Sequence, residues 1–143
     1  MKKSFLILIA VLSILIITAC SNDELSGKTF DVSVVGSPNE PSNLHSIMTL
    51  EFSDGNKVKN KMGYEEGSYE LQDDKLVIQF ENENELLEIE FALKESDIES
   101  SQYAAEIINL KYEIEDSNLV SKLEGLDQKL QLSHFEFIEK QEG

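Results

Sequence analysis

The chain has 143 residues, with 12 basic residues, all of them lysine, against 28 acidic ones, and a net charge of −16. This length fits one domain, with or without a leader, better than two domains. Nucleic-acid binding needs an excess of lysine or arginine to neutralise phosphate, so the charge excludes that class of partner. We predict a single acidic domain.

The first segment has the pattern of an export signal. Lys2 and Lys3 precede a mainly apolar run over residues 5–17, and polar residues follow from Ser21. This order is typical of a secretory signal peptide, and the run is shorter than the ~20 residues that span a bilayer. We expect residues 1–19 to be removed, which takes away two lysines and leaves a net charge of −18.

The only cysteine of the chain stands at the expected cleavage point. Ile17-Thr18-Ala19-Cys20 resembles the lipobox of bacterial lipoproteins. The resemblance implies that Cys20 carries a diacylglyceryl group and becomes the first residue of the mature protein. An exported chain with one free thiol is the alternative, although a lone thiol has no partner for an internal disulfide. We expect attachment to the extracytoplasmic side of the cell membrane, with residues 20–26 as a lipidated tether and residues 27–140 as the domain.

From residue 27 onward, apolar and polar residues alternate with a period of two. Such alternation is typical of strands with one buried and one exposed face. The apolar positions that share a side in each run are Phe30, Val32 and Val34; Met48, Leu50 and Phe52; Leu76, Ile78 and Phe80; Leu87, Ile89, Phe91 and Leu93; and Ile108, Leu110, Tyr112 and Ile114.

The connections between these runs are mostly short. Asp54-Gly55 predicts a hairpin turn, because glycine tolerates a positive φ. Asp73-Asp74 and residues 81–84 predict two more tight reversals. Residues 37–45, which contain two prolines, predict one long loop. Short reversals predict an antiparallel meander, because parallel strands need long crossovers.

The period changes near the C-terminus. Leucines spaced four, three and four residues apart predict a short amphipathic helix over residues 118–128, with Ser117 or Asn118 as its cap. A last strand follows, and its facing shifts near Ser133-His134, which a β-bulge would explain.

About eight strands and one helix are therefore expected, in an all-β fold. A chain of this size has no second layer of helices to cover the apolar face of the sheet. Closing the meander into a barrel buries that face and removes the open edges. A two-sheet sandwich is the alternative fold.

The start of the domain, Leu25-Ser26-Gly27-Lys28-Thr29-Phe30, followed by a strand meander, resembles the small lipocalin-like lipoproteins of Gram-positive bacteria. The resemblance covers roughly residues 25–139. The lipocalin signature Gly-x-Trp is replaced here by Gly27 and Phe30, and the chain has neither tryptophan nor arginine. The resemblance therefore implies a looser calycin-type barrel.

Catalytic and cofactor motifs are missing. His45 lies in the expected loop and His134 on the last strand, but no Gly-x-Ser-x-Gly elbow or phosphate-binding glycine loop accompanies them. We predict that the protein is not an enzyme and carries no cofactor, and that His134 has a structural role at a bulge or barrel rim.

Two groups of carboxylates could offer oxygen ligands to Ca²⁺. They are Asp73-Asp74 and the series Glu81, Glu83 and Glu85, which lie near two turns. They lack the twelve-residue loop of a recognisable calcium site. Alternating glutamates are more often a solvated strand face, so no metal site is predicted.

Lys57, Lys59 and Lys61 are spaced by two residues, which places them on one face of a strand. This lysine stripe has two interpretations. It could contact lipid headgroups or an acidic wall polymer, or it could protect an edge strand from aggregation. The second interpretation is favoured.

The barrel interior is the strongest candidate binding site. Its expected lining combines apolar side chains with two tyrosine hydroxyls, which suits an apolar ligand with a few polar handles. The same large side chains also suit a solid core, and small inward residues are scarce, which slightly favours a filled barrel. The expected lining is Phe30, Met48, Leu50, Phe52, Tyr69, Leu71, Ile78, Phe80, Ile89, Phe91, Leu110 and Tyr112.

Two functions remain open from the sequence. In the first, a membrane-anchored lipoprotein holds a small apolar or amphiphilic ligand at the barrel mouth, with Tyr69, Tyr112, Phe91 and Phe52 as contacts. In the second, a filled barrel is a scaffold whose acidic surface binds another envelope protein or a cationic molecule.

Overall fold

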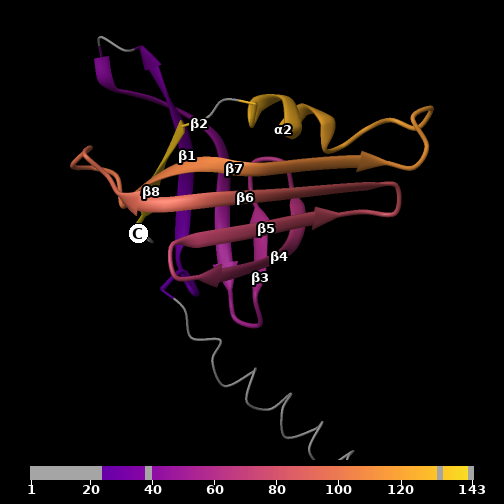
Figure 1. Cartoon of the computed structure of the whole chain (residues 1–143), viewed down its shortest axis with the longest axis horizontal. Coiled ribbons are helices and arrows are strands. Elements are labelled where there is room, and N and C mark those ends of the chain that lie inside the picture. Colours follow the sequence, from indigo (N-terminus) through magenta and orange to yellow (C-terminus); the bar gives the residue numbers. More distant parts are fainter. Residues whose placement is uncertain (1–23, 38–39, 132–133, 142–143) are drawn as a thin grey trace, which may run out of the picture.

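Alternation of apolar and polar residues gives this chain strands with one buried face, and eight such strands close into a barrel (Figure 1). The computed structural model describes residues 24–37, 40–131 and 134–141. The strands are β1 (Thr29–Ser37), β2 (Glu40–Ser53), β3 (Lys57–Asn60), β4 (Glu65–Gln72), β5 (Lys75–Glu81), β6 (Glu85–Glu95), β7 (Tyr103–Ile114) and β8 (His134–Lys140). The helix α2 (Glu124–Lys129) lies between β7 and β8.

The barrel is an antiparallel meander that closes on itself. Each strand pairs with the next one along the chain, and β8 pairs with β1. The closing register runs from Thr29 opposite Lys140 to Ser33 opposite Glu136. The predicted all-β barrel, with one short helix before the last strand, is confirmed, and the sandwich alternative is wrong.

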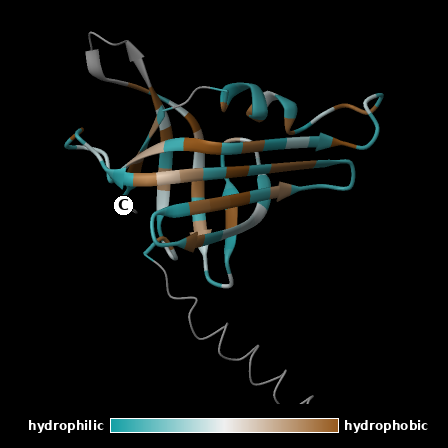
Figure 2. Ribbon diagram, viewed as in Figure 1, coloured by the Kyte–Doolittle hydropathy of each residue, from teal (hydrophilic) through white to brown (hydrophobic). Residues whose placement is uncertain are grey.

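The apolar face of each strand points into the barrel. In β6, every second residue from Glu85 to Leu93 is buried, and the residues between them are partly exposed. Figure 2 shows the same alternation of brown and teal along the strands. All the residues predicted to line the interior are buried or packed against the buried cluster. The predicted strand facing is therefore confirmed for this lining. It is wrong for Ile108, which was expected on the inward side of β7 and is 52% exposed, because a register shift in the pairing with β6 leaves it between the partners of Glu90 and Phe91.

Aromatic rings fill the middle of the barrel. Phe137 on β8 contacts Phe30 on β1 and Phe91 on β6, with ring centroids 6.0 Å and 5.4 Å apart. Phe135 packs on the other side of Phe91, also edge to face. An eight-stranded barrel is just wide enough for side chains to fill it. The interior is thus a packed core.

All three predicted reversals are confirmed, because two or three residues join β2 to β3, β4 to β5 and β5 to β6. Between β2 and β3, Gly55 and Asn56 have φ angles of 77° and 59°. Between β4 and β5, Asp73 has a φ of 55°. Asn and Asp adopt this left-handed conformation more readily than most residues, because their short polar side chains bond locally.

The long loop predicted over residues 37–45 is wrong. β1 and β2 continue through this region as a hairpin, and Val35 lies opposite Leu44. The pairing of β1 with β8 stops at Ser33, so this part of the hairpin is a two-stranded ribbon that projects from the barrel (Figure 1). Pro41 has no N–H group, and a ribbon strand with only one partner tolerates it.

The predicted helix over 118–128 is shorter and starts later, at Glu124. Neither Ser117 nor Asn118 caps it. Instead, the Ser121 hydroxyl accepts a hydrogen bond from the Glu124 backbone N–H at 2.9 Å. Leu123, Leu126 and Leu130 are buried in the core, so the helix is placed by its leucines and by contacts made before its first turn.

The predicted bulge near Ser133-His134 falls where β8 begins, and Ser133 lies outside the described residues. The described pairing of β7 with β8 is regular. Register shifts occur instead between Val32 and Ser33 of β1 and between Glu90 and Phe91 of β6.

Candidate functional site

The two ends of the barrel are built differently, and the candidate sites lie there. We call the plug end the one that holds Leu25, the β2–β3 and β4–β5 turns and the β6–β7 connection. We call the helix end the one that holds α2 and the β3–β4 and β5–β6 turns. Figure 1 shows the chain joining β1 at the plug end, on the far side of the barrel from α2.

Leu25 closes the plug end. The Leu25 carbonyl accepts a hydrogen bond from the Lys28 N–H at 3.0 Å, and the Gly27 N–H donates to the Phe52 carbonyl at 2.9 Å. Gly27 has a φ of 82°, which a residue with a Cβ adopts only with strain. This turn directs Leu25 into the barrel, where it is fully buried.

A pocket of about 430 Å³ lies beside this plug. Its apolar part consists of Leu25, Leu71, Leu93 and Tyr103. Leu25 and Leu93 belong to the buried core, so the pocket rests directly on the packed interior. Its polar part is Glu24, Asp73, Asp74, Lys94, Glu95 and Gln102. The pocket therefore joins an apolar surface to a mainly acidic rim.

Tyr103 lies between these two parts. Its ring packs on Phe30, with the centroids 6.0 Å apart, and its hydroxyl donates a hydrogen bond to Glu24 Oε2 at 3.3 Å. Burial and the negative charge of Glu24 raise the pKa of Tyr103, so the phenol stays protonated. Tyr103 thus supplies a hydrogen-bonding group at the edge of an apolar surface.

The helix end holds a buried carboxylate. Glu85, the first residue of β6, is 4% exposed, because it lies on the inward face of the strand. Its Oε2 accepts hydrogen bonds from the hydroxyl of Tyr112 at 2.6 Å, from the Leu123 N–H at 3.2 Å and from the hydroxyl of Ser121. Its Oε1 accepts from the Lys122 N–H at 2.8 Å.

These hydrogen bonds decide the charge of Glu85. Burial alone would raise its pKa, but the bonds from Ser121, Tyr112, the Lys122 backbone and Asn82 lower it to about 2. The pKa of Tyr112 is raised, first by burial and then by its bond to this carboxylate. Glu85 is therefore an anion that fastens the segment before α2 to β6, and we call this arrangement the Glu85 latch.

The four residues predicted to contact a ligand lie in or against the core. Phe52, Phe91 and Tyr69 are buried, and Phe52 packs on Tyr69 with their ring centroids 4.7 Å apart. The Tyr112 hydroxyl is bonded to Glu85 and Ser121, so the fold itself supplies the partner that a ligand was expected to supply. None of the four lines the pocket at the plug end. Ligand contact by these residues stays a prediction.

The lysine stripe lies on the outer face of the barrel, as expected. Lys59 pairs with Glu66 at 3.7 Å and Lys61 with Glu51 at 3.2 Å, all with well-exposed side chains. The favoured interpretation, protection of an edge strand, is wrong, because β3 is paired with both β2 and β4. Lys59 and Lys61 instead pair with acidic side chains of the neighbouring strands β4 and β2.

The two groups of carboxylates considered as calcium ligands are separated by the fold. Asp73 and Asp74 lie at the plug end, whereas Glu81, Glu83 and Glu85 lie at the helix end. The expectation that Glu85 faces solvent is wrong, since it forms the latch. Within residues 24–37, 40–131 and 134–141, no group of three or more His, Cys, Asp or Glu side chains is arranged to hold a metal ion.

The histidines lie apart. His45 is exposed on β2. His134 begins β8, at the barrel rim, and its Nε2 lies 3.4 Å from Glu136 Oε1. Glu136 is buried and accepts hydrogen bonds from Ser96 and Ser101, both at 2.7 Å, which fixes the β6–β7 connection to β8. His134 and Glu136 thus belong to a structural contact.

Sequence reasoning missed Leu25 and Glu85 as the residues that shape the two ends. Glu85 is separated from Leu87, Ile89 and Phe91 by even numbers of residues, and this spacing predicts that it shares their inward face. Leu25 precedes the first strand, and nothing in the alternation points to it.

No protein-family model, no curated protein and no solved structure matches this chain. Among the described residues, α2 is too short and too polar to cross a membrane, and no other helix there meets that requirement. Cys20 and residues 1–23 lie outside the described part of the chain.

Proposed function

We propose that the protein is a lipoprotein of the extracytoplasmic membrane surface, anchored through Cys20, which holds a small amphiphilic ligand in the pocket at the plug end. The observation that carries this proposal is the pocket itself, an apolar surface with a polar rim at one mouth of a filled barrel. Its volume of about 430 Å³ lies in the range of small-molecule sites, ~300–1,000 Å³.

The position of the pocket supports the same function. Glu24 is part of the rim, and only three residues separate it from Cys20. An extended chain spans at most ~3.6 Å per residue, so the rim stays within about 14 Å of the anchored cysteine. A membrane amphiphile would therefore reach the pocket over a short path.

The rim also restricts the head group of the ligand. Glu24, Asp73, Asp74 and Glu95 outnumber the single basic side chain there, Lys94. Like charges placed together oppose binding, so the rim disfavours an anionic head group and accepts a neutral or cationic one. The Tyr103 hydroxyl donates its proton to Glu24, and its oxygen can still accept a hydrogen bond from a head group.

The ligand proposal is tested by methyl NMR of the full chain in nanodiscs, titrated with a spin-labelled single-chain amine. We expect broadening of the methyl signals of Leu25, Leu71 and Leu93, and its loss in Leu71→Glu. The matched control is Ile108→Glu, on the exposed face of β7. The proposal would be contradicted by broadening confined to methyl groups that neighbour Phe52 and Phe91. If Tyr69→Phe and Tyr112→Phe also reduced that broadening, binding would be assigned to the barrel interior.

The anchor is tested separately by Cys20→Ser. We expect labelled fatty acid to enter the native protein and not the variant, and the variant to remain uncut. Fractionation is a poor measure, because an uncut leader can itself hold the chain at the membrane. Equal labelling of both proteins would disprove the lipid anchor without affecting the ligand proposal.

A further inference from the structure

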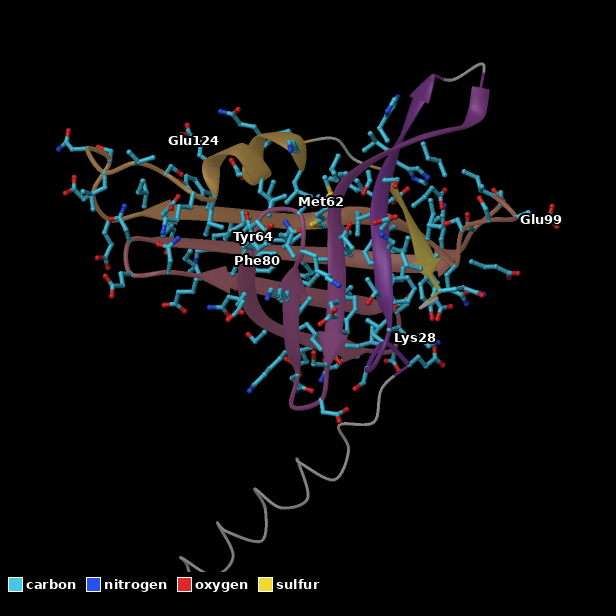
Figure 3. The ribbon with its side chains drawn as sticks, turned by 180° about the vertical axis from the view of Figure 1, so that it is seen from behind. Lys28, Met62, Tyr64, Phe80, Glu99 and Glu124 are labelled. Carbon is cyan, nitrogen blue, oxygen red and sulfur yellow. The ribbon has the colours of Figure 1, made fainter. Side chains whose placement is uncertain are left out.

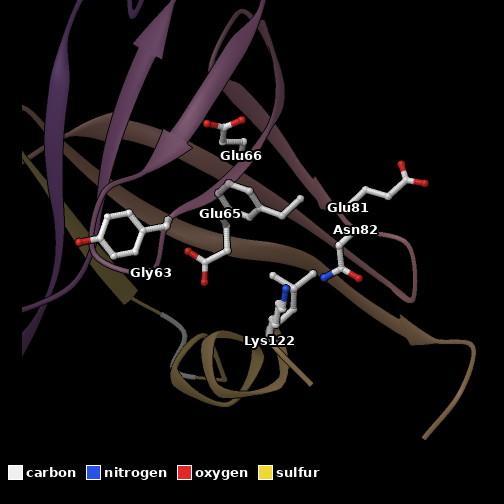
Figure 4. Close-up of a pocket in the computed structure, with 9 residues that line it drawn as sticks. Gly63, Glu65, Glu66, Glu81, Asn82 and Lys122 are labelled. Carbon is white, nitrogen blue, oxygen red and sulfur yellow. The ribbon is translucent and has the colours of Figure 1, made fainter. Parts of the chain in front are cut away.

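A groove crosses the helix end, between the β3–β4 turn and the segment that precedes α2. One part of about 260 Å³ lies between Tyr64 and Lys122, and an adjoining part of about 550 Å³ lies along Leu119 and Val120. The two parts share Asn82 and Lys122, so they form one continuous depression. Figure 4 shows the first part, with Glu65 and Glu66 on one side and Asn82 and Lys122 on the other.

Large apolar side chains lie exposed along this groove. Val120 is 91% exposed, Tyr64 is 80% exposed and Leu119 is 56% exposed. They represent three of the five exposed large apolar residues within the described part of the chain. Tyr64 lines the first part of the groove, and Leu119 and Val120 line the second. Single exposed apolar residues are ordinary, but several along one polar-rimmed groove favour an interaction surface. Figure 3 shows Tyr64 and Met62 on the side of α2, away from Lys28.

Tyr64 adds an independent observation. Its φ is 63°, in the left-handed region, which a bulky residue adopts less readily than Gly or Asn. The exposed ring recovers little of this cost by burial. Neither backbone nor packing therefore explains a tyrosine here, whereas contact with a partner does.

The walls of the groove hold their shape before any partner arrives. On one side, Asn60 is buried and its side-chain oxygen accepts hydrogen bonds from the Thr49 and Met62 N–H groups, which fixes the β3–β4 turn. On the other side, the Glu85 latch fixes the backbone of Lys122 and Leu123. A preformed surface loses less entropy when it binds.

The charge around the groove is strongly negative. Lys122 is its one basic residue, against a set of carboxylates from four segments of the chain. The carboxylates are Glu65, Glu66, Glu81, Glu83, Glu85, Glu115 and Asp116. Electrostatic complementarity therefore favours a basic partner, and the exposed apolar cluster favours one that also presents apolar side chains.

We propose that this groove is a docking site for a basic segment with interspersed apolar side chains, presented by a second protein. The proposal does not depend on the pocket at the plug end or on the lipid anchor. The groove and that pocket lie at opposite ends of the barrel, so one protein could carry both interactions at once.

The test uses the purified full chain in nanodiscs and a fluorescent ten-residue peptide of alternating lysine and leucine. We expect the peptide to bind, and the affinity to fall about tenfold as salt rises from roughly 0.05 M to roughly 0.3 M. Leu119→Ser and Val120→Ser together should weaken binding about tenfold, by removing apolar contact. Tyr64→Asn should weaken binding about fivefold and leave the protein folded, because Asn suits the left-handed backbone. Ile108→Ser, an exposed apolar residue outside the groove, should change nothing.

Three results would overturn the proposal. A lysine–serine peptide that binds as tightly as the lysine–leucine peptide would leave only unspecific attraction to an acidic surface. An equal effect of Ile108→Ser would place the contact outside the groove. Sedimentation of the protein alone as a dimer, which Val120→Ser dissociates, would assign the groove to a second copy of this chain.

Discussion

The plug end and the helix end close the same barrel by opposite means. At the plug end a single apolar side chain, Leu25, covers the core, and a pocket with an apolar surface remains beside it. At the helix end three leucines cover the core, and the Glu85 latch joins the segment before α2 to β6 by several hydrogen bonds. Hydrogen bonds with fixed directions select one arrangement, whereas one apolar contact leaves room next to it. This difference is why we propose a ligand at the plug end and a docked partner at the helix end.

The largest effect on stability is expected in the aromatic core between the two ends. Phe91→Ala removes a ring that packs on Phe135 and Phe137, and we expect the free energy of unfolding to fall by about 3–5 kcal/mol. Ile108→Ala, on the exposed face of β7, should change it by less than ~0.5 kcal/mol. Urea denaturation of both variants measures the difference, and equal values would mean that the strand facing is wrong.

Breaking the latch should damage the helix end selectively. Glu85→Ala leaves the Tyr112 hydroxyl and the N–H groups of Lys122 and Leu123 without their acceptor, which we expect to cost about 2–4 kcal/mol. Hydrogen exchange should accelerate over residues 121–130 and stay unchanged around Leu25. An unchanged exchange pattern at α2 would show that its leucines alone hold it.

Removing the plug should damage the other end. Leu25→Ala is expected to lower the free energy of unfolding by about 2–3 kcal/mol, because it leaves space over the core. Exchange should then rise in the β4–β5 turn and the β6–β7 connection, and the α2 amides serve as the internal control. Equal acceleration of hydrogen exchange in α2 and at the plug end would show that the stability of one end depends on the other.

The latch also predicts a pH dependence that the plug lacks. The pKa of Glu85 is about 2 in the folded protein, against an ordinary value of 4.5. A lowered folded pKa stabilises the fold at pH values above 4.5, and this contribution is lost as the pH falls towards 2. By linkage it amounts to about 3 kcal/mol. The difference in unfolding free energy between the native protein and Glu85→Gln should shrink over this range, whereas the difference for Leu25→Ala should stay constant.

The smallest effect is expected at Tyr64. Tyr64→Asn should raise the free energy of unfolding by about 0.5–1 kcal/mol, since Asn adopts a positive φ at lower cost. Thermal denaturation measures this gain, with Met62→Asn in the same turn as the control. A loss of stability would mean that the exposed ring packs on the fold after all.

The barrel could be predicted from the sequence because alternation is local. The alternation within each strand predicts which of its residues face inward. Short turns such as Asp54-Gly55 allow few ways to connect successive strands. The ends of the barrel could not be predicted in the same way. The partners of Glu85 lie on β7 and before α2, far along the chain, and no spacing rule links a carboxylate to Ser121. The alternation and the leucine spacing therefore predict a helix that starts at residue 118, whereas the contacts of Ser121 and Glu85 place its start at Glu124.

The ribbon cannot be predicted from the sequence pattern, because Pro41 favours a loop. A proline excludes a central strand, but it does not exclude a strand with one open side. Similarly, Glu136 has the parity of an outward residue, and it is buried only because Ser96 and Ser101 of the β6–β7 connection cover it. The position of a residue along a strand predicts whether it faces into or out of the barrel. It does not predict which outward residues are buried by connecting segments.

The pairing of the first strand with the last gives the fold an order of assembly. The hairpins from β2 to β7 join neighbours in the chain and can form while the rest is still unfolded, since closing a short loop is fast. The seam between β1 and β8 joins Thr29 to Lys140 and must wait for both termini of the domain. Until that step, β1 and β8 are open edges with unpaired backbone groups. The barrel therefore cannot close before residues 134–140 are free to pair with both neighbouring strands.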